Sequence, residues 1–172
     1  AAGARVYLRT TATAIRPRDD GGFVVESDGA AGTLEASRVW STIPNAVLAR
    51  IVEPQAPEDL QQAAASLELR SMILIYLVLE THQFTEYDAH YFPGENIPFT
   101  RLSEPKNYSA QGTPQGRTVL CAELPCSQAD EAWTMDDATL GKIVKDGLAE
   151  AGLPVRCEVS SVATRRLPAA YP

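Results

Sequence analysis

The chain has 172 residues, of which 45% are hydrophobic and 22% are charged, a composition typical of a globular protein. Its net charge of -7 and the dispersal of its Lys and Arg residues argue against a nucleic-acid partner, which would require a basic face. No apolar run approaches the roughly 20 residues that a membrane-spanning helix needs. We therefore expect a globular chain with no nucleic-acid partner and no membrane span.

The chain contains three cysteines, at Cys121, Cys126 and Cys157. Three are too few for a disulfide scaffold, and their spacing is not that of a zinc site. We interpret them as plain buried thiols, because free cysteine usually packs as a small hydrophobic residue. The sequence thus predicts a reducing, cytoplasmic setting and no metal site.

The first 44 residues have the alternating pattern of β-structure, interrupted by turn residues. The turn at residues 18–22 is rich in Asp and Gly, which tolerate a left-handed backbone, and Asp28-Gly29 marks a second turn. We expect a three-stranded meander followed by one more strand that ends at Pro44. The predicted strands cover residues 6–15, 23–27, 33–36 and 38–43.

Two short helices are expected next. The first begins at Pro44-Asn45 and runs to Ile51, and the second begins at Pro57 and runs to about Leu67. The prolines between them favour a boundary near residues 51–57. The predicted domains are therefore 1–52 and 53–172.

The second half predicts an α+β unit. The apolar run at residues 71–79 is nearly unbroken, which is typical of an interior strand with both faces covered. A long helix is indicated by apolar residues at helical spacing, with Thr134 as its N-cap and Gly152 just beyond its end. The helix face carries Leu140, Ile143, Val144 and Leu148, and further strands are expected at residues 91–92, 99–102, 118–123 and 159–167.

The predicted fold class is therefore α+β. It combines an antiparallel or mixed β-sheet with a few packed helices, preceded by the three-stranded β-meander.

No catalytic motif stands out in the sequence. It has no GxSxG, no HExxH and no phosphate-binding glycine loop, and its two histidines, His82 and His90, have no Cys or Ser partner at a recognisable spacing. A polar cluster near residues 100–105 includes Arg101 and Glu104, with Tyr91 nearby in sequence. One interpretation is that this cluster faces a cleft. A solvated strand end with a surface ion pair, and an aromatic core that includes Tyr91, are the more common explanations of such residues.

Several segments resemble FAD-dependent amine-oxidase-like proteins. In that family, a strand resembling residues 6–15 lies beside the adenosine part of FAD, and a strand resembling residues 36–44 leads towards the substrate domain. The segments 101–105 and 123–125 look closest to the branch of protoporphyrinogen oxidase and UDP-galactopyranose mutase. The closing segment 166–172 is similar to the "R.P.AYP" strand of that branch.

The resemblance implies FAD in the full-length parent and roles for six residues. Ala12, which stands where the family pattern has Val, would approach FAD together with Thr42 and Pro44. The substrate pocket would be lined by Tyr91, Arg101 and Glu104, with Arg101 placed for an anionic group. No residue of the chain is assigned a catalytic role, because the flavin carries the reaction.

We therefore expect a fragment of a FAD-dependent oxidoreductase, comprising its substrate-binding domain and a remnant of its flavin domain. Without a GxGxxG segment, the chain alone is expected to bind no FAD and to be inactive. Its strands would have open edges that favour pairing with a second copy, and its end after a strand suggests a chain that once continued. The alternative is a stand-alone, non-catalytic α+β module that binds a small molecule.

Overall fold

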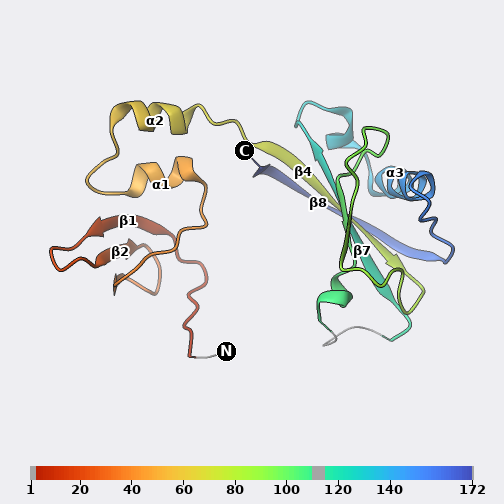
Figure 1. Ribbon diagram of the computed structural model, residues 1–172, viewed down its shortest axis with the longest axis horizontal. Coiled ribbons are helices and arrows are strands. Elements are labelled where there is room, and N and C mark those ends of the chain that lie inside the picture. The colour runs from red at the N-terminus through yellow and green to blue at the C-terminus, as the bar shows by residue number, and fades with distance from the viewer. Residues whose placement is uncertain (1–2, 110–114, 172) are drawn as a thin grey trace. The chain divides into compact units, whose positions relative to one another are not determined.

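The computed structural model describes residues 3–109 and 115–171 (Figure 1). The chain forms two compact units that divide between Leu67 and Glu68. The boundary expected after residue 52 lies earlier than this division. The second helix, which the sequence assigned to the later part, packs with the first helix and belongs to the first unit.

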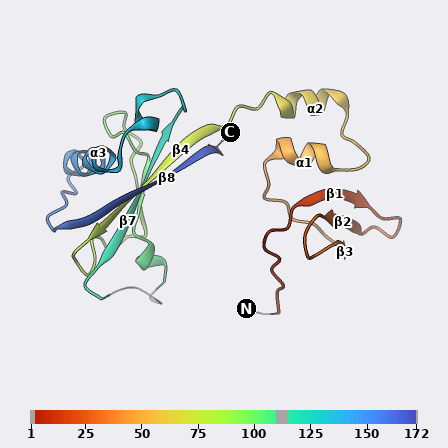
Figure 2. The same ribbon diagram turned by 180° about the vertical axis from the view of Figure 1, so that it is seen from behind.

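The first unit contains an antiparallel three-stranded sheet in the order β1-β2-β3 (Figure 2). The β1–β2 turn closes through hydrogen bonds between Arg18 and the Gly21-Gly22 pair, with Gly21 at a φ of 85° that only glycine adopts without strain. The meander expected from the sequence is therefore confirmed. The strands are β1 (Ala12–Pro17), β2 (Phe23–Ser27) and β3 (Thr33–Ala36).

Two helices follow the meander, α1 (Asn45–Ile51) and α2 (Glu58–Ala65), both as expected. The chain after α1 returns to β1, where the Glu53 amide donates to the Ile15 carbonyl at 2.8 Å. The Arg16 guanidinium donates to the carboxylates of Glu26 and Glu53. These contacts join α1 to the meander.

Two of the expected strand segments were wrong. Residues 6–11 form no strand, and β1 begins only at Ala12; Val6 and Leu8 are 78% and 79% exposed. Residues 38–43 also form no strand, and Trp40 is 89% exposed. Apolar alternation is not sufficient for a strand, because a strand needs a continuous ladder of backbone hydrogen bonds to a neighbour. Thr11 accepts one such bond, from the Asp28 amide at 3.1 Å, but neither segment is part of a strand ladder in the described part of the unit.

The second unit contains a five-stranded antiparallel sheet in the order β5-β6-β7-β4-β8. Its longest apolar strand, β4, pairs with β7 on one side and β8 on the other, so the predicted interior position is confirmed. The strands are β4 (Arg70–Leu79), β5 (Ala89–Tyr91), β6 (Arg101–Ser103), β7 (Thr118–Cys126) and β8 (Val159–Tyr171). Short 3-10 helices η1 (Pro105–Tyr108) and η2 (Glu131–Thr134) lie in its connections.

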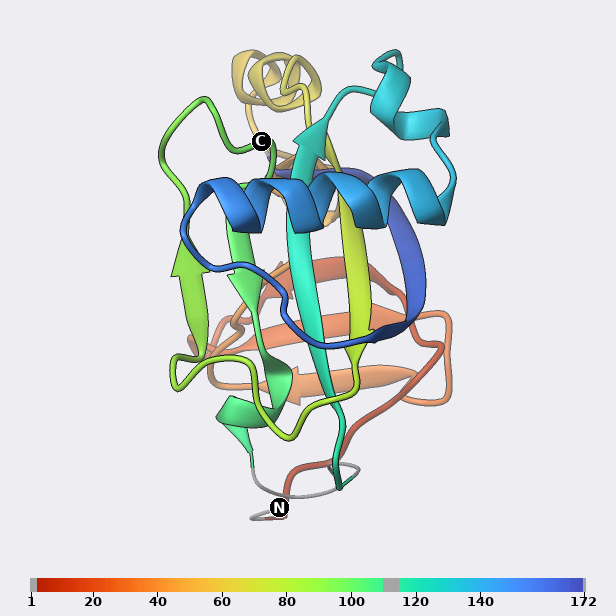
Figure 3. The ribbon, with the colours of Figure 1, turned by 90° about the vertical axis from the view of Figure 1, so that its right-hand side faces the viewer.

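Helix α3 (Asp137–Glu150) lies across one face of this sheet (Figure 3). It buries Leu140, Val144 and Leu148 completely against the strands. Gly147 permits the close approach, because a Cβ atom there would lie 2.7 Å from Cε1 of the buried Phe99. The core of the unit therefore lies between α3 and this face.

The two ends of α3 give one confirmed and one wrong prediction. Gly152 has a φ of 78°, and the Leu153 amide donates to the Leu148 carbonyl at 2.8 Å, which is the expected glycine-terminated end. The N-cap is Asp136 and not Thr134. The Asp136 carboxylate accepts from the Thr139 amide at 2.7 Å, whereas Thr134 ends η2. With these elements, the α+β class is confirmed.

Candidate functional site

The two faces of the five-stranded sheet differ in burial. Along β4, every second residue from Ile73 to Leu79 is fully buried under α3, whereas Leu74, Tyr76 and Val78 are only half-buried. Side chains alternate between the faces of a strand, so the half-buried set lies on the face opposite α3. The one α-helix in the described part of this unit, α3, lies on the other face (Figure 3), and we call the face without it the open face.

Arg101 and Glu123 form a charged pair on the open face. They are directly opposite each other on β6 and β7, and Nε of Arg101 donates to Oε1 of Glu123 at 2.9 Å. A second guanidinium nitrogen donates to the same oxygen. The pair raises the pKa of Arg101 above its ordinary value, mainly through the bond to Glu123 and then through Tyr91, its cross-strand neighbour on β5.

A cavity of about 440 Å³ lies beside this pair. Its wall is mostly apolar, and the Tyr171 hydroxyl donates to Oε2 of Glu123 at 3.5 Å. An apolar concavity with a few convergent polar groups is the usual form of a small-molecule site. The lining residues are Met72, Leu74, Glu123, Leu167, Ala169, Ala170 and Tyr171.

Tyr76 and Cys121 lie side by side on the open face, as cross-strand partners on β4 and β7. Burial raises the pKa of the Tyr76 hydroxyl above 10.0, and the neighbouring Cys121 adds to the effect. Burial likewise raises the pKa of the Cys121 thiol above 9.0, followed by the charge of Glu123. Both groups are therefore neutral near pH 7, and this part of the face offers weakly polar contact without charge.

The structure brings Tyr91 and Arg101 together and leaves Glu104 outside their cluster. Glu104 is 1% exposed, and its carboxylate accepts hydrogen bonds from the Phe84 and Thr85 amides and the Thr118 hydroxyl. It is three residues from Arg101, an odd spacing that directs it away from the open face. Its contacts anchor the loop after β4.

The sequence did not single out Glu123 or Tyr171 as site residues. The signal available for Glu123 was a carboxylate within the apolar strand β7, since a buried charge requires a partner. Nothing local identified that partner, because the β6–β7 register joins residues 22 positions apart. Tyr171 reaches the site through β8, across a still longer separation.

The residues predicted to approach FAD are all in the first unit. Ala12 begins β1 and pairs with Ser27 at a register shift, Thr42 is exposed in the connection after β3, and Pro44 precedes α1 as its N-cap. They come from a strand end, a coil and a helix start. None of them supplies a charged side chain for a phosphate.

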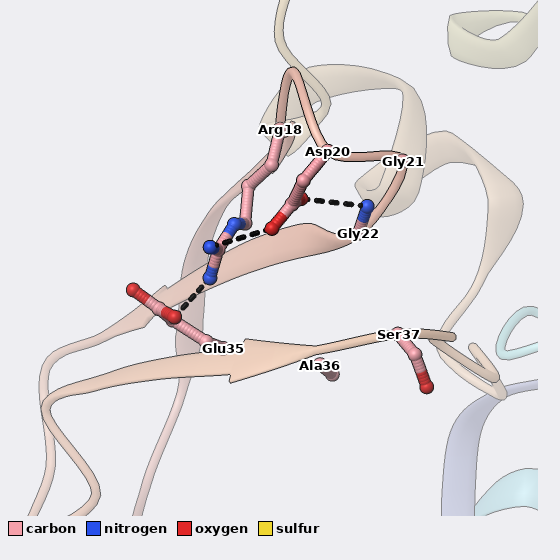
Figure 4. A pocket seen from close by; sticks show the side chains of 7 residues that line it. All are labelled: Arg18, Asp20, Gly21, Gly22, Glu35, Ala36 and Ser37. Atoms are coloured by element: carbon pink, nitrogen blue, oxygen red, sulfur yellow. Dashed lines mark hydrogen bonds and ion pairs between the residues drawn. The ribbon is translucent and has the colours of Figure 1, made fainter.

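A second cavity, of about 300 Å³, lies at the β1–β2 turn and β3 (Figure 4). Its one guanidinium, from Arg18, donates to the carboxylates of both Asp20 and Glu35, and Asp20 also accepts from the Gly22 amide at 3.1 Å. Two acids around one cation do not suit a pyrophosphate. This cavity therefore does not fit the phosphate part of a dinucleotide by itself.

Two further properties concern the described residues only. No group of three or more His, Cys, Asp and Glu side chains is placed to hold a metal ion within 3–109 and 115–171. Over the same residues, no helix has the length and apolar content to cross a membrane.

Several solved structures share the fold of this chain. Reduced UDP-galactopyranose mutase matches with a TM-score of 0.58 and 20% identity, over 94% of this chain and 34% of that one. Putrescine oxidase bound to putrescine matches with a TM-score of 0.57 and 22% identity, over 94% and 35%. A structure described as a protoporphyrinogen oxidase from Exiguobacterium sp. 255-15 matches with a TM-score of 0.50 and 20% identity, over 94% and 36%.

The chain thus spans about a third of the length of the solved structures that it matches. At these identities the likeness establishes the fold. A comparison with curated proteins gives no match. The family model for flavin containing amine oxidoreductases matches residues 1–172, so the chain belongs to that family.

Proposed function

We propose that this chain is the substrate-binding part of a FAD-dependent oxidoreductase, together with a portion of its flavin domain. The second unit supplies the wall of the substrate cavity, and the first unit contacts the flavin cofactor. The proposal rests on family membership and on the open face, where a mostly apolar cavity lies beside Arg101 and Glu123.

The open face suits substrate binding because the two faces of the sheet have different roles. The α3 side of the sheet is fully buried and keeps the strands in place. The opposite side has apolar residues around a cavity, with polar groups already held by hydrogen bonds. A rigid support of this kind orients a bound molecule with little loss of side-chain entropy.

The first unit has features of a surface that another part of an enzyme covers. Val6, Leu8 and Trp40 are strongly exposed apolar side chains, and such residues clustered in one unit are typical of contact surfaces. We propose that Ala12, Thr42 and Pro44 approach the flavin nucleotide from this unit. Its phosphates would be held by parts of the enzyme other than the described residues of this unit.

In such an enzyme, bound flavin takes a hydride from a C–N or C–C bond of the substrate. The residues of this chain have a different task. Met72 and Leu74 exclude water from the cavity, and the Arg101–Glu123 pair fixes the polar end of its wall. We also propose that open strand edges of this chain pair with a second copy, and this proposal does not depend on the substrate cavity.

The alternative is a stand-alone module that binds an apolar ligand in the same cavity without catalysis. The family match over residues 1–172 favours the enzyme part. The two proposals differ in one measurable property, which is whether the cavity affects the reaction of a flavin.

The test uses the flavoenzyme that contains this chain. A Leu74→Trp variant fills the cavity, and we expect it to slow anaerobic reduction of the flavin at least about tenfold with the fastest of a panel of amines and carboxylic acids. Its flavin absorbance spectrum should be unchanged. Ala149→Trp on the exposed side of α3 is the control. Unchanged flavin reduction in a folded Leu74→Trp enzyme would overturn the proposal.

A further inference from the structure

Arg165 is a charged residue of the open face that sequence reasoning did not consider. It lies on β8 directly opposite Leu74 of β4. The next residue, Arg166, points to the α3 side, where Nε donates to the Trp133 carbonyl at 2.6 Å and a second nitrogen donates to the Met135 carbonyl at 2.5 Å. Because successive side chains alternate, Arg165 points to the open face.

The guanidinium of Arg165 has no charged partner within the described part of the chain. It has no hydrogen bond or ion pair with residues 3–109 or 115–171, whereas the guanidinium of Arg101 is held by Glu123. The Arg165 charge lowers the pKa of Tyr76 against the larger effect of burial, so it acts at the open face. This cation is exposed and available to a ligand.

Arg165 does not itself line the cavity but is a neighbour of two residues that do. Leu74, its cross-strand partner, and Leu167, two residues along the same strand, both line the cavity. The one acidic lining residue is Glu123, which Arg101 already neutralises. Once Glu123 is paired with Arg101, the uncompensated charge next to the apolar cavity is the positive charge of Arg165, although the chain as a whole has a net charge of -7.

We infer that Arg165 is a specificity-determining residue that binds the anionic group of an amphipathic substrate, whose apolar part occupies the cavity along Met72, Leu74 and Leu167. The inference rests on the proposed function, because it assigns a substrate class to the same cavity. A guanidinium binds carboxylate or phosphate oxygens through two parallel hydrogen bonds. The shared chemistry of the ligand is therefore an oxyanion attached to an apolar chain.

The experiment measures the affinity of the flavoenzyme for octanoate, octyl phosphate and octanamide by titration calorimetry. The amide has the same apolar chain without the charge. We expect the wild-type enzyme to bind at least one of the two anions about tenfold more tightly than the amide, and Arg165→Gln to remove that difference. Which anion binds more tightly distinguishes a carboxylate from a phosphate. Lys145→Gln, which removes one positive charge from α3 on the other side of the sheet, should leave all three affinities unchanged.

The outcomes separate this inference from the proposed function. Equal binding of both anions and the amide, or equal losses for all three ligands in Arg165→Gln, would overturn the role of Arg165 and leave the cavity intact. Leu74→Trp should weaken binding of every ligand, because it fills the apolar part. If it changes none of the affinities, the cavity itself is not the binding site, and the proposed function fails with it.

Discussion

Arg101 and Glu123 pair across β6 and β7 with unequal exposure. The side chain of Arg101 is 37% exposed and that of Glu123 only 9%. The buried partner is thus the acid, and in the described part of the chain Arg101 is its one ion-pair partner. Removal of the arginine would leave a carboxylate that has lost its compensating charge beside an apolar cavity.

We therefore expect Arg101→Gln to lower the free energy of unfolding by about 1–2 kcal/mol, a reduced value because the guanidinium is partly in solvent. Urea unfolding at neutral pH measures it. A combined Arg101→Gln and Glu123→Gln variant should recover much of the loss. Arg117→Gln breaks a more exposed pair with Glu80 and should cost less. Equal losses in Arg101→Gln and Arg117→Gln would contradict this account.

Glu104 should matter for stability more than any exposed acid. Glu104→Ala removes the acceptor of the Phe84 and Thr85 amides and of the Thr118 hydroxyl, and leaves these donors without a partner. We expect a loss of about 2–4 kcal/mol in the free energy of unfolding. Hydrogen exchange should accelerate at the two amides before the rest of the sheet.

The control for this change is Glu95→Ala, which removes an exposed carboxylate from a loop of the same unit. It should change stability by less than about 0.5 kcal/mol. If the Phe84 and Thr85 amides exchange at the same rate in wild type and Glu104→Ala, the carboxylate does not anchor the loop.

Gly147→Ala distinguishes packing from helix propensity. Alanine favours a helix interior by about 1 kcal/mol, but its Cβ would lie 2.7 Å from the ring of Phe99, which is buried and cannot swing away. We expect a net loss of about 1–3 kcal/mol in thermal or urea unfolding. In a Phe99→Leu background the same change should cost less. A more stable Gly147→Ala protein would show that α3 and Phe99 are further apart.

Sequence patterns within a few residues correctly predicted the elements whose structure depends on neighbouring residues alone. The unbroken apolar run of β4 identified an interior strand, and Gly152 identified the end of α3. The turn at Gly21 required a positive φ that only glycine provides easily. In each case the residue type and the backbone geometry agree within a few positions of sequence.

Register and partner choice are not local, and the failures follow from that. Residues 6–11 and 38–43 have strand-like composition but are not part of a strand ladder in the described part of their unit. Arg101 and Glu104 are close in sequence, yet strand alternation puts them on different faces. The partner that Arg101 does have, Glu123, and the free cation Arg165 are brought to the same face only by the pairing of β6, β7, β4 and β8.

The N-cap of α3 gives a test with a pH dependence. The Thr139 amide donates to the Asp136 carboxylate and holds the pKa of Asp136 below its ordinary value of 3.8. A carboxyl group whose pKa is lower in the folded state stabilises the protein above pH 3.8, and this stabilisation is lost as the pH falls through the folded-state pKa. Because other carboxyl groups titrate nearby, the measured quantity is the difference in the free energy of unfolding between wild type and Asp136→Asn. Asparagine retains the cap but cannot ionise. The difference should therefore be constant at neutral pH, and below pH 3.8 the wild type should lose stability relative to Asp136→Asn.

The position of the cap is tested separately. Asp136→Ala should lose the cap at every pH, whereas Thr134→Ala should change little, because Thr134 lies in η2. A larger loss in Thr134→Ala than in Asp136→Ala would mean that α3 begins where the sequence pattern first indicated.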